Sequence, residues 1–258
     1  MEKAKLNVVK IGGGILENSS LLEKTIQSFK SLSGTKLLVH GGGKTATHIC
    51  SKMGIPIKML EGRRITDIPT LDVVTMVYAG LINKKLVCLM QKNGVNALGL
   101  SGADGNLIKA SKRPVHPIDY GYVGDVESVN TNLICNLLGL NLVPVICALS
   151  HNQNGQLLNT NADTIARHLA LSLQSQFDIH LSYVFEKPGV LLNPEDDQST
   201  IPTLDQKSFQ ELKTKQIIQN GMIAKLDNAF KVIAETSIKV KLGSFAMLSQ
   251  ENHGTKLI

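Results

Sequence analysis

Two runs of three glycines, at residues 12–14 and 41–43, each follow a short apolar segment. Glycine has no Cβ, so a ligand can approach the backbone N–H groups of such a turn closely. Where a helix begins directly after the turn, its N-terminus also favours a bound anion. Two such turns at neighbouring strand ends predict a mouth that binds phosphate or carboxylate groups. The structural alternative is a pair of tight turns that bind nothing.

Charged and amide side chains that could serve an anion site lie elsewhere in the chain. Lys10 ends the apolar segment VVK, immediately before the first glycine run. Asn159, Asn161 and Asp163 come just ahead of a segment of helical period, and capping that helix needs only one of them. Lys225 lies early in another such segment, where a cation opposes the helix dipole. Its position therefore suggests that an anionic partner lies nearby.

Two known phosphate-binding patterns were compared with the second glycine run. The segment GGGKT resembles the end of a P-loop, but that pattern requires glycine where this chain has Leu38. Gly41, Gly43 and Ala46 fit the pattern G-x-G-x-x-A, and Glu61 lies where a ribose-binding acid would be expected. A dinucleotide-binding fold is therefore a formal rival, although it leaves the lysine before the first glycine run without a role.

The sequence predicts strands and helices that alternate along the chain. Apolar, often β-branched segments predict strands at residues 8–10, 36–40, 95–100, 142–149, 179–185 and 238–242. Segments of helical period lie between most of them, at residues 21–32, 72–90, 161–173 and 222–233. This order predicts an α/β fold, a three-layer sandwich of helices around a mostly parallel sheet. Because no strong linker is visible, we expect a single domain, residues 1–258, with two lobes on one continuous sheet.

Composition narrows the class of protein. The 258 residues are 43% hydrophobic and 19% charged, and no uninterrupted apolar run approaches the roughly 18 residues of a membrane span. The first residues lack the pattern of a secretion signal, so we expect a cytoplasmic protein. The net charge of +6 is spread along the chain without a nucleic-acid motif, which favours a small anionic substrate. No CxxC spacing supports a metal site or disulfides, and reduced, buried thiols are expected at Cys50, Cys88, Cys135 and Cys147.

Eight motifs resemble those of a known family. The chain contains, in the order and spacing of acetylglutamate kinases of the amino acid kinase family, VVKIGGG, VHGGGK, GRRIT, GLSGADGNLI, YGYVGDV, LLNTNAD, GMIAK and GTKLI. The resemblance runs from residue 7 to the C-terminus. It implies the amino acid kinase fold, with a lobe of about residues 1–175 for acyl-glutamate binding and dimerisation and a lobe of about residues 176–258 for ATP.

The resemblance also implies a reaction and its catalytic residues. The reaction would be ATP-dependent phosphorylation of the γ-carboxylate of N-acetyl-L-glutamate, the second step of arginine biosynthesis, with Mg²⁺ carried by ATP. Lys10 and Lys225 match the two cations that stabilise the transferring phosphoryl group. Asp163 matches the carboxylate that orients both lysines. Gly12 and Gly13 match the residues whose N–H groups bind phosphate.

The acyl-glutamate site follows from the same motifs. Gly42 and Gly43 match residues that cradle the substrate's side-chain carboxyl, and Arg64 and Asn159 match residues that hold its α-carboxylate. An arginine suits that task because its planar fork can grip a carboxylate in two places. The alternative for Arg64 is an ordinary surface arginine.

One segment departs from the family pattern. Where the family has a motif like SDVxGVL, this chain reads SYVFEKPGVLL. Aligned on Gly189 and Leu191, Glu186 falls where the family's aspartate would be. These three residues, together with Ile217 and Gln219, are the predicted contacts to the nucleotide base and ribose.

Several alternatives stay open at this point. The acyl group could be succinyl instead of acetyl, in which case Arg63, Lys44 and Lys58 are candidates to bind its extra carboxylate. Another kinase of the same fold, acting on carbamate, aspartate or a nucleotide, and a catalytically silent amino-acid sensor are the other rivals. Only about six residues precede the first predicted strand, whereas arginine-inhibited hexameric members of the family have an extra helix there. We therefore expect a homodimer without arginine feedback.

Overall fold

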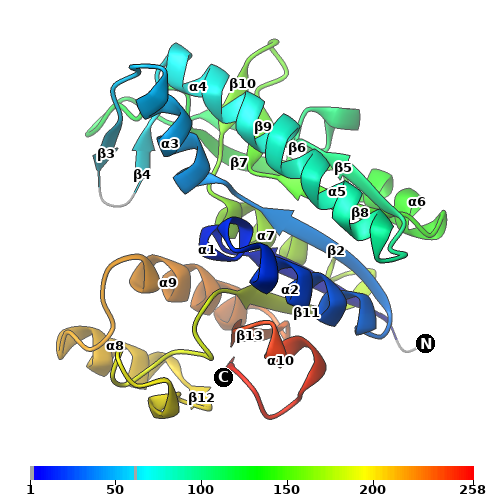
Figure 1. The fold of residues 1–258 in the computed structure, drawn as a ribbon, viewed down its shortest axis with the longest axis vertical. Helices are drawn as coiled ribbons and strands as arrows, with labels where there is room; N and C mark the ends of the chain where they lie inside the picture. The colour runs from blue at the N-terminus through cyan, green and yellow to red at the C-terminus, as the bar shows by residue number, and fades with distance from the viewer. Residues whose placement is uncertain (1–2, 61–62) are drawn as a thin grey trace.

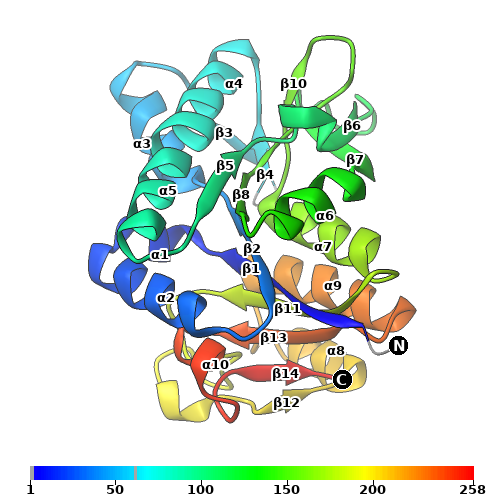
Figure 2. The same cartoon turned by 90° about the vertical axis from the view of Figure 1, so that its right-hand side faces the viewer.

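One sheet of eight strands runs through the molecule (Figure 2), in a computed structural model that describes residues 3–60 and 63–258. In spatial order its strands are β12 (Thr203–Leu204), β14 (Thr255–Leu257), β13 (Lys239–Gly243), β11 (Phe177–Val184), β1 (Ala4–Ile11), β2 (Thr35–His40), β8 (Val143–Cys147) and β5 (Ala97–Leu100). The strands from β13 to β5 are parallel, and β14 runs antiparallel to β13. The carboxyl ends of the parallel strands therefore meet at one edge.

Helices cover both faces of this sheet (Figures 1 and 2). One layer contains α1 (Gly13–Glu17), α2 (Ser19–Ser31), α3 (Gly43–Lys52), α4 (Ile68–Thr75), the π-helical segment η1 (Met76–Ile82), α5 (Asn83–Lys92) and α10 (Ala246–Ser249). The other contains α6 (Thr131–Gly139), α7 (Ala162–Leu173), α8 (Gln206–Thr214) and α9 (Asn220–Glu235). The predicted three-layer α/β sandwich is confirmed.

The sheet continues without interruption from the early to the late part of the chain. Strand β1 lies between β2 and β11, and Lys10 pairs in register with Tyr183. Residues 6–11 of β1 are all buried, as expected for a strand covered on both faces. The two lobes therefore share one sheet and one hydrophobic core.

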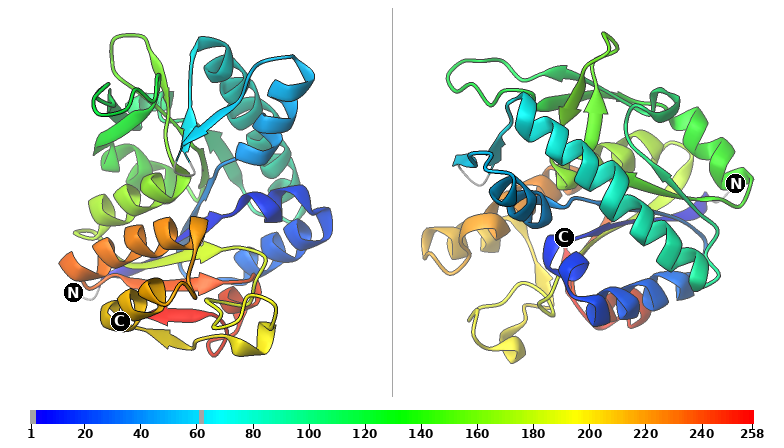
Figure 3. Two further views of the ribbon diagram at one scale, coloured as in Figure 1. Left: turned by 90° about the vertical axis from the view of Figure 1, so that its left-hand side faces the viewer. Right: turned by 45° about the horizontal axis from the view of Figure 1, so that its top comes forward.

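Short strands that the sequence analysis did not predict surround the upper part of the molecule (Figure 3). A four-stranded sheet contains β10 (Leu157–Asn159), β9 (Leu149–His151), β6 (Ile108–Lys112) and β7 (Gly124–Val129). A two-stranded sheet contains β3 (Lys58–Leu60) and β4 (Arg63–Ile65), and 3₁₀ turns occur at η2 (Asp104–Asn106) and η3 (Asp197–Ser199). These strands mix polar and apolar residues and lack the continuous apolar run of a strand that is buried on both faces.

The helical segment Ile68–Lys92, made of α4, η1 and α5, is long and apolar enough to cross a membrane by length and composition alone. The sequence was not expected to contain such a segment. Within its most apolar window 44% of the residues are buried inside the structure, and Val77 and Leu86 lie in the core. A core helix meets the same criterion, and packing against the sheet accounts for its composition.

The cysteine prediction holds for two of the four residues. All four cysteines are free, and Cys50 and Cys147 are buried. Cys88 is exposed and Cys135 is half-buried, so the prediction of buried thiols is wrong for these two. Both lie on amphipathic helices, where the side chain can face solvent.

Candidate active site

A cavity of about 560 Å³ lies at the carboxyl ends of β1 and β2. Seven of the fourteen predicted site residues line it. Its described lining comprises Lys10, Ile11, Gly13, Gly41, Gly42, Gly43, Lys44, Met59, Arg63, Arg64, Tyr78, Arg113, Val123, Gly124, Ala148, Asn159, Thr160, Asn161, Ala162, Asp163, Thr164 and Gly221. These residues come from strands, turns and helix N-termini that are far apart in the sequence.

One buried carboxylate pairs with two lysines beside this cavity. The Nζ atom of Lys10 lies 2.8 Å from Asp163 Oδ1, and the Nζ atom of Lys225 lies 3.4 Å from Asp163 Oδ2. Burial alone would raise the pKa of Asp163, but the charges of Lys10 and Lys225 outweigh it and lower the pKa to about 2. The aspartate is therefore ionised throughout the physiological range.

The start of α7 explains why Asp163 is free to make these pairs. Asn161 is the N-cap, and its side-chain oxygen accepts hydrogen bonds from the backbone N–H groups of Asp163 and Thr164. Because Asn161 satisfies these helix donors, the Asp163 carboxylate is not needed as a cap. Asp163 can instead face the two lysines.

Lys225 reaches the carboxylate from the first turns of α9. Its Nζ atom lies 5.8 Å from the ring centroids of both Tyr183 and Phe185, within the range of a cation–π interaction. Burial, followed by repulsion from Lys10, lowers the pKa of Lys225, and the Asp163 charge opposes both effects. Asp163 is the anionic partner that the position of this lysine suggested.

The glycine run at residues 41–43 packs closely against the long helix. A Cβ on Gly42 would lie 2.4 Å from Ile82 Cδ1 and 2.9 Å from the ring of Tyr78. Glycine is therefore required here for close packing. Gly43 is the first residue of α3, so the first N–H groups of that helix have no intrahelical acceptor and face the site as potential anion ligands.

The first glycine run differs from the prediction in one respect. Gly13 lines the cavity, but the N–H of Gly12 donates to the carbonyl of Val184 at 2.8 Å. A Cβ on Gly12 would approach that same carbonyl oxygen to 3.3 Å. The Gly12 N–H thus joins β1 to β11, and of the two predicted phosphate donors only Gly13 lines the cavity.

Arg64 and Asn159 meet through a buried threonine. Asn159 Nδ2 donates to Thr66 Oγ1 at 3.0 Å, and that hydroxyl donates to the Arg64 carbonyl at 3.2 Å. Arg64 is only 7% exposed, and its Nη2 donates to the Gly43 carbonyl at 2.9 Å. Its Nη1 is buried without a hydrogen-bond partner in the described part of the chain. Arg64 is therefore no ordinary surface arginine, and it retains a donor for a ligand.

The five residues predicted to contact the nucleotide base and ribose, Glu186, Gly189, Leu191, Ile217 and Gln219, lie outside this cavity lining. The exposed Glu186 side chain lies against Gly14, where an added Cβ would be 1.2 Å from Glu186 Oε1. Gly189 is buried between Thr200 and Thr255, and a Cβ would meet both within 2.7 Å. Close packing is sufficient to explain this glycine.

Arg113 is a charged cavity residue that was not predicted from the sequence. Arg113 lines the cavity, is paired with the Asp125 carboxylate, and stacks 5.4 Å from the centroid of the Tyr120 ring. Tyr78 of η1 and Gly221 of α9 also line it. The motif YGYVGDV, which contains Tyr120 and Asp125, was the one available sequence signal for the position of Arg113.

Three further predictions concern the acyl pocket and the dinucleotide rival. Arg63 and Lys44 line the cavity, whereas Lys58 is not among the lining residues. Glu61, the acid that the dinucleotide pattern requires, lies outside the described residues. Lys10, which that pattern left unexplained, now has a partner in Asp163.

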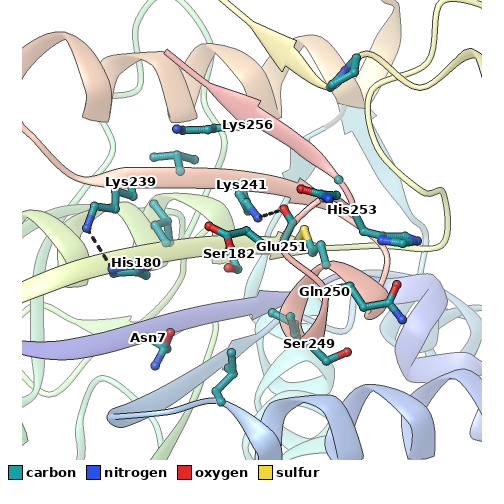
Figure 4. A pocket seen from close by; sticks show the side chains of 18 of the residues that line it. Asn7, His180, Ser182, Lys239, Lys241, Ser249, Gln250, Glu251, His253 and Lys256 are labelled. Carbon is teal, nitrogen blue, oxygen red and sulfur yellow. Dashed lines mark hydrogen bonds between the residues drawn. The ribbon is translucent and has the colours of Figure 1, made fainter.

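A larger cavity, of about 810 Å³, lies on the sheet face between α2 and α10 (Figure 4). Two of its lysines have partners, one an aspartate outside the lining and the other a backbone carbonyl. Lys239 Nζ lies 3.1 Å from Asp178 Oδ2, and Lys241 Nζ donates to the Glu251 carbonyl at 2.6 Å. None of the predicted site residues lines it. The smaller cavity is therefore the candidate active site.

The chain is similar in sequence to members of a known family. The sequence model of the amino acid kinase family matches residues 5–244. The chain is 48% identical over 253 residues to an acetylglutamate kinase of Phocaeicola vulgatus, covering 98% of each chain. It is also 48% identical over 255 residues to an acetylglutamate kinase of Bacteroides thetaiotaomicron, covering 99% of each.

Solved structures share the fold at lower sequence identity. Carbamate kinase from Giardia lamblia, bound to AMP-PNP, superposes with a TM-score of 0.70 at 14% identity, with 99% of this chain and 98% of that chain covered. N-acetylglutamate synthase from Neisseria gonorrhoeae gives a TM-score of 0.81 at 21% identity, with 100% of this chain and 60% of that chain covered. From the family match and the two close relatives, the chain belongs to the amino acid kinase family.

Proposed function

We infer that this chain catalyses ATP-dependent phosphorylation of the γ-carboxylate of N-acetyl-L-glutamate, a step of arginine biosynthesis. Two relatives named acetylglutamate kinase are 48% identical to this chain over nearly its whole length. The observation that carries the mechanism is the placement of Lys10 and Lys225 on the single carboxylate of Asp163 beside the cavity.

The reaction needs charge neutralisation more than proton transfer. A γ-carboxylate with a pKa of about 4.3 is already ionised at neutral pH, so its attack on the γ-phosphorus needs no general base. As the new oxygen–phosphorus bond forms, the bond from the γ-phosphorus to the bridging oxygen of ADP breaks. Lys10 and Lys225 stabilise the negative charge of the phosphoryl group in transit, and Asp163 keeps both ammonium groups oriented.

The acyl-glutamate occupies the part of the cavity around the second glycine run in this proposal. The N–H groups at Gly42 and Gly43 bind the side-chain carboxyl. Arg64, through its unpartnered Nη1, and Asn159 bind the α-carboxylate. The network through Thr66 holds these two residues in position before the substrate binds.

The N–H donors and positive charges around the cavity suit the phosphate groups of a nucleoside triphosphate. Gly13, the N-terminus of α9 near Gly221, and the two lysines provide N–H groups and positive charge for phosphate oxygens. Among the described lining residues the one carboxylate is Asp163, which is already paired twice. Mg²⁺ would therefore be held through ATP, where it neutralises phosphate charge. We assign the base and ribose to the lobe of residues 176–258, around Glu186, Gly189, Leu191, Ile217 and Gln219.

The assembly we propose is a homodimer that acts in the cytoplasm. The long helix leaves Met76 53% exposed and Leu81 39% exposed on its outward side. Between them lies Gly80, where a Cβ would have no neighbour within 4 Å. An apolar helix surface beside a glycine suits the close approach of the same helix from a second copy. A cytoplasmic location is consistent with the consumption of ATP.

Trapping the acyl phosphate as its hydroxamate tests the proposed reaction. The purified protein is incubated with ATP, Mg²⁺, hydroxylamine and, in separate reactions, N-acetylglutamate, N-succinylglutamate, glutamate and aspartate. We expect hydroxamate with N-acetylglutamate and little with the two free amino acids. If only N-succinylglutamate gives hydroxamate, the acyl group of the substrate is succinyl and not acetyl. Absence of product from all four would overturn the proposal.

A further inference from the structure

A buried histidine lies directly before the second glycine run. His40 is the last residue of β2, and its side chain is 0% exposed. Its Nδ1 lies 2.8 Å from the Gly41 carbonyl oxygen, and its Nε2 lies 3.0 Å from Asn83 Nδ2. Asn83 is the first residue of α5 and is itself buried. The imidazole therefore joins the long helix to the glycine run.

The surroundings fix which ring nitrogen carries the proton. Asn83 Nδ2 also donates to the Val145 carbonyl at 2.9 Å, while Asn83 Oδ1 accepts from Lys84 Nζ at 3.2 Å. The amide nitrogen is thus the group that faces His40, and because it can only donate, His40 Nε2 must accept. The proton then resides on Nδ1, which donates to the Gly41 carbonyl.

The ring stays neutral under physiological conditions. Burial lowers the pKa of His40 to about 4, with a small further contribution from Lys84, against the opposing effect of the hydrogen bond to Gly41. A fully buried, neutral imidazole outside the cavity lining cannot transfer a proton to a substrate. Its contribution must therefore pass through the groups to which it is bonded.

We propose that His40 and Asn83 are positioning residues for the carboxylate-binding turn, an inference that rests on the proposed function. In a trans peptide the C=O of Gly41 and the N–H of Gly42 point in opposite directions, so fixing the carbonyl fixes the N–H. Arg64 Nη2 bonds the Gly43 carbonyl, which orients the N–H of Lys44 in the same way. The Gly42 carbonyl, which shares its peptide with the Gly43 N–H, accepts from the Ala46 N–H at 2.9 Å. With these carbonyls held by hydrogen bonds, the N–H groups of the turn are preorganised for an anion.

A glycine on the neighbouring strand β5 leaves space for the Asn83 side chain. Gly99 of β5 lies so close that an added Cβ would be 1.9 Å from Asn83 Oδ1. A side chain at position 99 would displace the amide, and the amide ties α5 to the carbonyl of Val145 in β8. The Asn83 amide is therefore built into the junction of β8, β5 and the long helix.

Steady-state kinetics of matched variants test the proposal. Asn83→Leu and His40→Phe remove the hydrogen bonds while keeping most of the side-chain volume. His40→Asn keeps an amide nitrogen near the position of Nδ1. We expect the KM for N-acetylglutamate to rise about tenfold in the first two variants, with the KM for ATP within about twofold, and to be largely restored in His40→Asn. Asn7→Leu is the control, because Asn7 is equally buried and donates to Ser33 and Thr35 carbonyls away from the cavity.

The outcomes separate this inference from the proposed function. If the wild-type protein makes no acyl phosphate, the proposed function fails. If it is active but Asn83→Leu behaves like Asn7→Leu, or raises both KM values equally, the positioning role is wrong. Should the variants not fold, ¹⁵N NMR of the wild-type histidines decides. A His40 ring protonated on Nδ1 and unchanged between pH 5 and 8 supports the inference, and a ring protonated on Nε2 overturns it.

Discussion

Asp163 holds two ammonium groups with a single carboxylate, and each group comes from a different part of the chain. Lys10 ends β1 and Lys225 lies in α9, so neither local sequence nor local structure brings them together. Without the aspartate two buried positive charges would face each other, which is strongly unfavourable. The pairing therefore serves stability as well as chemistry, and the two contributions can be separated.

The pH dependence of stability isolates the structural part. The pKa of Asp163 is lowered from 3.8 to about 2, so its contribution to stability is fully present above pH 3.8 and is lost as the pH falls through 2. Asp163→Asn removes this titration. We expect the difference in the free energy of unfolding between wild type and Asp163→Asn, measured with urea, to narrow between pH 4 and pH 2. A difference that stays constant over this range would contradict the assignment.

The catalytic part is tested at Lys10. In Lys10→Ala the phosphoryl group loses one of its two cations, and by analogy with the loss of a single transition-state donor we expect kcat to fall about 10²–10³-fold. The KM for N-acetylglutamate should change little, since other residues hold its carboxylates. Lys52→Ala, on the exposed end of α3, is the control. An unchanged kcat in Lys10→Ala would remove this lysine from the mechanism.

At the scale of elements, helix starts position much of the site. Helices α3, α7 and α9 all begin at the cavity, with Gly43, Asp163 and Gly221 near their first turns. For α3 the parallel sheet produces this arrangement, because α3 starts directly after β2 at the carboxyl edge. Helix α7 follows β10 of the four-stranded sheet and α9 follows α8, so their starts reach the cavity by other connections. The caps of these helices therefore influence both folding and chemistry.

Replacing the N-cap of α7 compares the contribution of a helix cap to stability with its contribution to catalysis. Asn161→Ala removes the acceptor for the N–H groups of Asp163 and Thr164, and we expect a loss of about 1 kcal/mol in the free energy of unfolding together with a several-fold lower kcat. Asn18→Ala removes the matching cap of α2, away from the cavity. It should lose similar stability with kcat unchanged. Equal kcat values for the two variants would mean that the α7 cap has no part in orienting Asp163.

At the scale of the whole molecule, the outward side of the long helix defines the expected dimer. Leu81→Glu places a charge on the proposed contact surface, and we expect sedimentation velocity to detect a dimer for wild type and a monomer for this variant. Leu140→Glu is the control, because Leu140 is 68% exposed at the end of α6 on the other helix layer. The proposal is contradicted if wild type and Leu81→Glu are both monomeric, or if wild type is a hexamer.

The sequence was sufficient for six of the eight strands of the large sheet and for α2, the long helix, α7 and α9, because these segments have clear apolar patterns. It missed the short strands β12 and β14 and the helices α3, α6 and α8, and it began β1 and the long helix four residues late. The short strands β3, β4, β6, β7, β9 and β10 were not predicted, because they lack the continuous apolar, often β-branched run of a strand that is buried on both faces. Arg113 was missed for a related reason, because its clamp by Asp125 depends on the pairing of β6 with β7.

In the candidate site, the sequence was most informative about side chains whose charge or position a purely structural role does not explain. Lys225 early in a helix indicated an anionic partner, and the structure supplies Asp163. The Gly12 N–H looked like a phosphate donor because a glycine turn does not reveal which N–H groups the neighbouring strand will use. The nucleotide contacts around Glu186 stay a prediction. Side-chain positions in that loop depend on packing that no local pattern encodes.

The central place of β1 also has a consequence for the order of synthesis. The ribosome completes β1 at residue 11 and its neighbour β2 at residue 40, but the strand on its other side, β11, begins only at residue 177. At 5–20 residues per second, one edge of β1 waits roughly 10–30 s for its partner. During that interval β1, an apolar strand that is buried in the complete fold, has an open hydrogen-bonding edge, and such an edge can pair with another chain and lead to aggregation. We therefore expect newly made chains to depend on chaperones until the second lobe has emerged.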